Sequence, residues 1–108
     1  MSENADILNS TDPRTTIFNA NKDLIELKRK LKAVTESYKT KIKQEEAYIE
    51  KLTSEGVEDD GVKHIIAKSY IRLYQLEDDL KAESQDYKDQ IKEIKEVIRN
   101  SVEQIRNL

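Results

Sequence analysis

The only histidine of the chain, His64, stands four residues after Asp60. On a helix this spacing puts an imidazole and a carboxylate on one face, where both could contact a single metal ion. Two ligands are too few for a protein metal site, and the 108-residue sequence has no cysteine to add. We therefore interpret Asp60 as a helix cap and His64 as a surface residue, and we predict no metal site.

Catalytic groups with suitable partners are also missing from the sequence. Gly56 and Gly61 stand in one short acidic segment and are interpreted as turn residues, not as a phosphate-binding loop. The lone His64 is the only histidine that could serve as the base for a nucleophilic serine. Carboxylates are plentiful, but nothing in the pattern would desolvate them for acid–base work. We predict a protein that is not an enzyme, with no catalytic residue and no cofactor.

Basic side chains are the remaining candidates for chemistry, because they could contact a phosphate backbone. One group lies before the turn and the other after it. The candidate nucleic-acid contacts are Lys28, Arg29, Lys30 and Lys32 in the first group, and Lys63, Lys68 and Arg72 in the second. The competing interpretation is that carboxylates of a partner helix neutralise the first group.

The composition indicates what must position these residues. Charged residues make up 38% of the chain and hydrophobic residues 36%, with two glycines and one proline. This is typical of long helices and coiled coils, and 108 residues allow one domain at most. No apolar run could span a membrane, and the N-terminus does not resemble a secretion signal. We expect a cytoplasmic protein without a membrane partner.

The few helix breakers predict the element boundaries. Asp12 and Pro13 suit a helix start, and Gly56 suits the left-handed position after a helix, where a contact between Leu52 and Val57 would complete a Schellman motif. Asp59 or Asp60 would cap the next helix. We predict an all-α fold: a flexible tail over 1–11 and a long antiparallel two-helix hairpin over 12–108. Its parts are a helix over 13–54, a turn over 55–60 and a helix over 61–107.

Apolar residues three and four positions apart predict a coiled-coil seam on each helix. The first seam comprises Leu24, Leu27, Leu31, Val34, Tyr38, Ile42, Ile49 and Leu52. The second comprises Ile66, Leu73, Leu80, Tyr87 and Ile94 at intervals of seven and Leu108 fourteen residues later, flanked first by Leu76 and later by Ile91, Ile98 and Ile105. The change of flank near Ser84 predicts a shift of this seam by one residue.

Charge indicates the register of the hairpin. A turn centred near residue 58 pairs positions whose numbers add up to about 117. This places the basic stretch over 28–43 beside the acidic stretch over 74–89, and it places Glu45, which interrupts the first seam, beside Arg72. Complementary blocks of this kind specify orientation and register. The same pairing could form between two chains, so a swapped dimer stays open.

The segment HIIAKSYIRLYQL, residues 64–76, is apolar over a wider arc than one partner helix can cover. On a helical wheel the apolar arc spans about 240°, against about 120° on the facing part of the first helix. The residues left uncovered are Ala67, Tyr70, Ile71 and Tyr74, named here the tyrosine face. A patch of this kind predicts an interface with another chain. Three interpretations are open. The face could mediate self-association, with a dimer first; it could bind a different partner protein; or the tyrosines could lie half exposed in a monomer.

The segment EGVEDDGVKHIIAKSYIRLYQ, residues 55–75, resembles the turn and helix of small helical double-stranded-DNA-binding proteins of tailed phages. It is also similar to the GapR type of nucleoid-associated protein. The resemblance implies a homo-oligomer that binds duplex DNA with little sequence preference, through the basic residues named above. The chain departs from the GapR pattern where its second helix continues into the acidic EDDLKAESQDYKD, residues 77–89.

The leading hypothesis is a non-catalytic coiled-coil interaction or scaffold protein that self-associates through the tyrosine face into a dimeric or higher helical bundle. The first alternative is an oligomeric DNA-binding protein, phage-encoded and acting in the host cytoplasm. The second is an adaptor or inhibitor that docks on a larger host protein.

Overall fold

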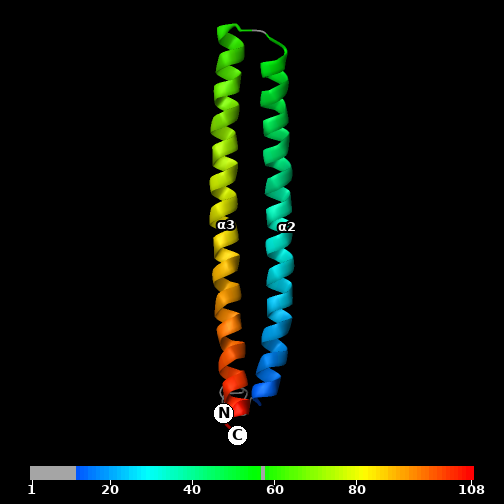
Figure 1. The fold of residues 1–108 in the computed structure, drawn as a ribbon, viewed down its shortest axis with the longest axis vertical. Coiled ribbons are helices and arrows are strands. Elements are labelled where there is room, and N and C mark those ends of the chain that lie inside the picture. The colour runs from blue at the N-terminus through cyan, green and yellow to red at the C-terminus, as the bar shows by residue number, and fades with distance from the viewer. Residues whose placement is uncertain (1–11, 57) are drawn as a thin grey trace, which may run out of the picture. The chain divides into compact units, whose positions relative to one another are not determined.

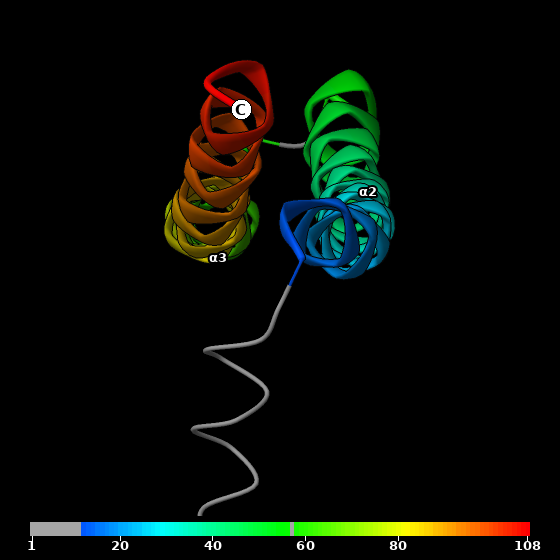
Figure 2. The same ribbon diagram turned by 90° about the horizontal axis from the view of Figure 1, so that it is seen from below.

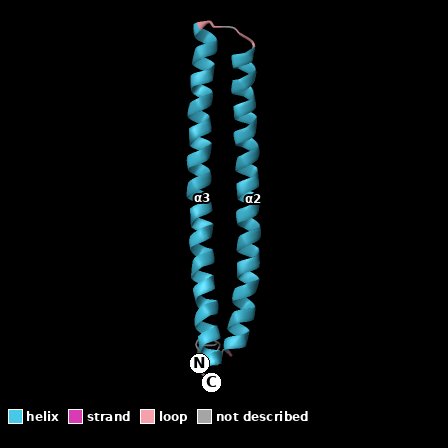
Figure 3. Ribbon diagram, viewed as in Figure 1, coloured by secondary structure: helices cyan, strands magenta, loops and turns pink. Residues whose placement is uncertain are grey.

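Two long helices make up the fold in the computed structural model, which describes residues 12–56 and 58–108 (Figures 1 and 3). Helix α2 covers Pro13–Ser54 and helix α3 covers Asp60–Arg106. The predicted all-α hairpin of two helices packed against each other is confirmed. The first helix has the predicted bounds, whereas the second begins and ends one residue earlier than predicted. The predicted tail over 1–11 lies outside the described residues.

The chain divides into two compact units, and both helices contribute to each. One unit comprises Leu31–Asp86 and contains the turn; the other comprises, among the described residues, 12–30 and Tyr87–Leu108. Within each unit a segment of α2 and a segment of α3 lie side by side and run in opposite directions (Figures 1 and 2). The units are called the turn unit and the terminal unit below.

Asp12 caps the start of α2, as the sequence predicts. The Arg14 backbone N–H donates to Asp12 Oδ1 at 2.9 Å, and the Arg14 guanidinium donates to Oδ2 at 2.7 Å. These hydrogen bonds hold the pKa of the Asp12 carboxyl below its usual value. Pro13 follows at the first helical position, where its missing N–H leaves no hydrogen bond unmade.

The turn between the helices depends on Gly56 and Asp59. Gly56 has a φ of 71°, the left-handed conformation that ends a helix and that glycine adopts without steric cost. The Asp59 carboxylate accepts a hydrogen bond from the Val62 backbone N–H at 2.8 Å, so Asp59 is the cap of α3. The interpretation of Asp60 as the cap is therefore wrong, because Asp60 is already the first helical residue. The predicted contact of Leu52 with Val57 lies outside the described residues, since Val57 is one of the gaps.

The core of the turn unit is a single layer between α2 and α3. Ile49 and Leu73 are buried, and the other seam residues of this unit are half-buried. Ser69, which the predicted seam omits, is 0% exposed. Complete burial of so small a side chain indicates that the two helix backbones approach closely at this level.

The core of the terminal unit follows the same plan. Ala20 and Leu24 of α2 and Ile91 and Ser101 of α3 are buried. Leu108, which the sequence places on the seam, is 97% exposed, so that prediction is wrong. The reason is that α3 ends at Arg106, and beyond it the helical spacing no longer directs a side chain toward α2.

Candidate interaction surface

The tyrosine face lies on the turn unit and is exposed at all four of its positions. Ile71 is 69% exposed and Tyr74 is 61% exposed. The rings of Tyr70 and Tyr74, one helical turn apart, form a tilted pair with centroids 6.2 Å apart and an interplanar angle of 48°. The pair presents two aromatic rings as one apolar surface. Aromatic residues are enriched at the centres of protein interfaces.

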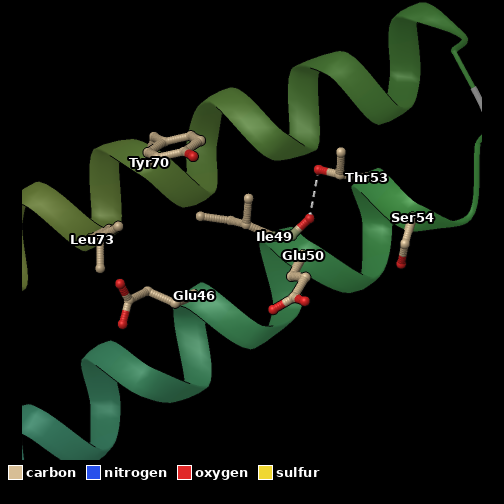
Figure 4. A pocket seen from close by; sticks show the side chains of 7 residues that line it. All are labelled: Glu46, Ile49, Glu50, Thr53, Ser54, Tyr70 and Leu73. Carbon is tan, nitrogen blue, oxygen red and sulfur yellow. Dashed lines mark hydrogen bonds between the residues drawn. The ribbon is translucent and has the colours of Figure 1, made fainter.

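A shallow groove of about 400 Å³ adjoins the tyrosine face, and Tyr70 lines both. Figure 4 shows Tyr70 and Leu73 of α3 opposite residues of α2, with Thr53 and Ser54 nearer the turn. The α2 wall consists of apolar Ile49, two carboxylates and two hydroxyls: Glu46, Glu50, Thr53 and Ser54. The Thr53 hydroxyl donates to the Ile49 carbonyl at 2.8 Å and is thus tied to its own helix. Sequence reasoning missed this groove, since it is made by two helices together.

Arg72 lies on the other side of the buried stripe and links the two helices. Its Nη2 is 2.9 Å from Glu45 Oε1 and donates to Ser69 Oγ at 3.0 Å. The predicted pairing of Arg72 with Glu45 is therefore observed, and it fits the predicted register. Glu45 is half-buried in the seam, so this ion pair supplies the partner that a carboxylate in that position needs.

Removal of Arg72 and Glu45, singly and together, should reveal a coupling free energy of about 0.5–1 kcal/mol, near the upper end for partly exposed pairs. The measurement is urea unfolding of Arg72→Ala, Glu45→Ala and the double variant. The control is the Arg99–Glu96 pair within α3, where both side chains are more than half exposed and about 0.2–0.5 kcal/mol is expected. Additive single effects at Arg72 and Glu45 would contradict the linking role.

Tyr38 makes a second connection between the helices of the turn unit. Its hydroxyl donates to Glu83 Oε1 at 2.6 Å, and Lys41 Nζ lies 5.4 Å from its ring centroid. Because ionised Tyr38 could not donate this bond, and because desolvation and nearby carboxylates also disfavour its anion, the pKa of Tyr38 is raised to about 12. In the predicted register Tyr38 is not level with Glu83, so its long side chain reaches diagonally across to Glu83.

Titration of the tyrosines should show Tyr38 ionising only near pH 12, well above the ordinary pKa of 10.0. A raised folded-state pKa means that the stabilisation is fully present below pH 10.0 and is lost as the pH rises through about 12. NMR with ring-labelled tyrosine measures this directly, with Tyr38→Phe to assign the signal. Glu83→Gln should move the pKa of Tyr38 back toward 10.0; no response to that change would show that Glu83 is not the cause.

The candidate nucleic-acid contacts do not converge on one surface of the turn unit. Lys68 and Arg72 share an outer strip of α3, because they are four residues apart, whereas Lys63 is turned by about 140° from Lys68. Lys32 is on α2, 22 residues before the position level with Lys63, which corresponds to about 33 Å along the helix.

The other residues of the first basic group, Lys28, Arg29 and Lys30, belong to the terminal unit and are exposed. The Arg29 guanidinium pairs with Glu26 of its own helix, which raises the pKa of Arg29. The sequence interpretation expected neutralisation from α3; for Arg29 the partner found is intrahelical.

Among the described residues, no group of three or more His, Asp and Glu side chains is placed to hold a metal ion. Within the same part of the chain, neither helix has a stretch apolar and long enough to cross a bilayer. His64 is exposed in the first turn of α3.

Comparison of the chain with protein-family models, curated proteins and solved structures finds no match.

Proposed function

We propose that this protein is a non-catalytic helical-hairpin module of the cytoplasm that associates with copies of itself through the tyrosine face. The observation that carries the proposal is the exposure of Ile71 and Tyr74, next to the paired ring of Tyr70. Burial of large apolar side chains contributes about 1.5–3 kcal/mol each. Two copies that covered this face would gain that contribution twice.

The balance of buried and exposed apolar residues supports association. Among the described residues, five apolar side chains are buried and eleven large ones are exposed. A two-helix layer buries only one stripe of each helix, and stable domains usually have two packed layers. Pairing two turn units would create a four-helix bundle and give α3 its second layer.

Binding of duplex DNA is the first alternative, and the arrangement of the basic residues favours it less. Arg72 is engaged by Glu45 and Ser69, and Lys63 is turned away from Lys68. The acidic groove walls, Glu46 and Glu50, would repel phosphate near the tyrosine face. A salt-sensitive band shift with duplex DNA, weakened by Lys68→Glu, would instead support the alternative.

Light scattering over a range of protein concentrations tests self-association. The wild type should form a dimer or a higher oligomer, and Ile71→Ser with Tyr74→Ser should raise the dissociation constant by roughly 100-fold or more, since two anchors are removed from each copy. The matched control is Ile25→Ser, because Ile25 is 61% exposed but lies on α2 of the terminal unit. That variant should keep the wild-type mass.

A wild-type monomer at high concentration would overturn the proposal. The tyrosine face would then be left to the second alternative, docking on a larger host protein. Retention of the oligomer in the Ile71 and Tyr74 double variant would place the interface elsewhere on the chain.

A further inference from the structure

The charges around the tyrosine face are arranged with internal symmetry. Positions 60, 63, 67, 70, 71, 74, 78 and 81 of α3 fall within an arc of about 100° on the helix. The steps between them read the same in both directions, with a centre between Tyr70 and Ile71. On one side of this centre lie Lys63 and Asp60, and on the other side lie Asp78 and Lys81.

When the order of these four charges is reversed and laid against the original order, each charge meets one of opposite sign. When two copies of α3 pack antiparallel about an axis between Tyr70 and Ile71, positions whose numbers add up to 141 face each other. Ala67 then meets Tyr74, and Tyr70 meets Ile71. The same operation sets Lys63 beside Asp78. It also sets Asp60 beside Lys81, and symmetry repeats every pair.

A parallel arrangement would set each of these charges against its identical counterpart and so give repulsion at all four positions. The four side chains are exposed, and none of the ion pairs found in residues 12–56 and 58–108 involves them. They are therefore free to take partners on a second chain.

We infer that the occupant of the tyrosine face is a second copy of this chain, bound antiparallel through α3 about a two-fold axis between Tyr70 and Ile71. The inference rests on the proposed self-association and adds its orientation and register. Apolar residues form the centre of this interface, and the Lys63–Asp78 and Asp60–Lys81 pairs form its rim. Charges of the rim contribute orientation more than affinity.

The groove fits this arrangement. Tyr70 lines the groove and also lies at the two-fold centre, so Ile71 of the second copy falls at the groove's rim. There it adds apolar surface beside Tyr70, which is exposed in the single hairpin, and beside the groove that Leu73 and Ile49 also line. The interface thus extends from α3 toward α2 of the turn unit.

Charge reversal tests the register. In the antiparallel dimer Lys63→Glu turns two attractive contacts into repulsive ones, as does Asp78→Lys, so each should raise the Kd of the dimer by roughly 10- to 30-fold at low salt. The double variant Lys63→Glu with Asp78→Lys restores opposite charges and should return to the wild-type Kd. In a parallel dimer the double variant would have no such rescue.

Cross-linking provides a second measurement, because the chain has no cysteine of its own. An oxidised mixture of the Ala67→Cys and Tyr74→Cys variants should yield a disulfide-linked pair, since these positions face each other across the axis. Neither variant alone should form a disulfide. Position 67 of one copy faces position 74 of the other, seven residues away from position 67 of that copy, so two identical positions lie about 10 Å apart along the helix.

The outcomes separate the two proposals. A monomeric wild type overturns both self-association and its register. If the wild type is dimeric but neither Lys63→Glu nor Asp78→Lys changes the Kd, the antiparallel register is overturned and self-association stands. The same holds if the Ala67→Cys variant alone forms a disulfide-linked dimer.

Discussion

Replacement of Leu73 with alanine is expected to lower the free energy of unfolding by about 2–5 kcal/mol. Leu73 is 6% exposed in the single core layer of the turn unit, and it lines the same groove as buried Ile49. The loss includes the transfer free energy of the removed atoms and the cost of the cavity that remains. Since most domains are stable by only about 5–15 kcal/mol, this one change should remove a large part of the total.

The matched control for Leu73→Ala is Ile71→Ala, two residues earlier on the same helix. Ile71 is exposed in the single hairpin, so its truncation should change the unfolding free energy of the monomer by less than about 0.5 kcal/mol. Urea unfolding of both variants, at concentrations low enough to keep any dimer dissociated, gives the comparison. Equal effects of the two changes would contradict the placement of the core between α2 and α3.

The hydrophobic period and the helix breakers were sufficient to predict the hairpin. Steps of three and four residues identified Ile49 and Leu73 as core, because burial of an apolar stripe is what holds such helices together. Gly56 identified the turn, because a positive φ strongly favours glycine. The Arg72–Glu45 pair followed from the register alone, since an antiparallel hairpin with a short turn has little freedom to slip.

Other features depend on three-dimensional packing that a pattern of apolar residues does not contain. A serine has no hydrophobic signal, so Ser69 and Ser101 were absent from the predicted seams although both are buried. Adjacent aspartates at the start of α3 are equivalent in type, and only the backbone geometry assigns the cap to Asp59.

The candidate surface was predictable in part. Exposure of the tyrosine face followed from comparing the apolar arcs of the two helices, because the narrower apolar arc of α2 could not cover the wider apolar arc of α3. The groove beside Tyr70 was not predictable, since its shape depends on which side chains of α2 flank the seam at that level. The tie between Tyr38 and Glu83 was missed for a related reason: a long side chain reaches beyond the residue opposite to it.

Replacement of Ser69 with leucine is the second change from which we expect a large effect. The site is 0% exposed and holds a small side chain between closely approaching helices, so added carbon atoms must push the backbones apart or adopt strained rotamers. Overpacking of this kind typically costs about 1–3 kcal/mol. Leucine has a higher helix propensity than serine, so a loss of stability in this variant would not come from helix propensity.

Ser69→Ala separates the packing effect from the hydrogen bond that Arg72 donates to the serine hydroxyl at 3.0 Å. Arg72 keeps Glu45 as a partner and remains in contact with water, so the alanine variant should lose less than about 1 kcal/mol. Thermal and urea unfolding of both variants measure the difference. If the leucine variant were as stable as the alanine variant, the helices would have room at this level, and the close approach inferred from the burial of Ser69 would be wrong.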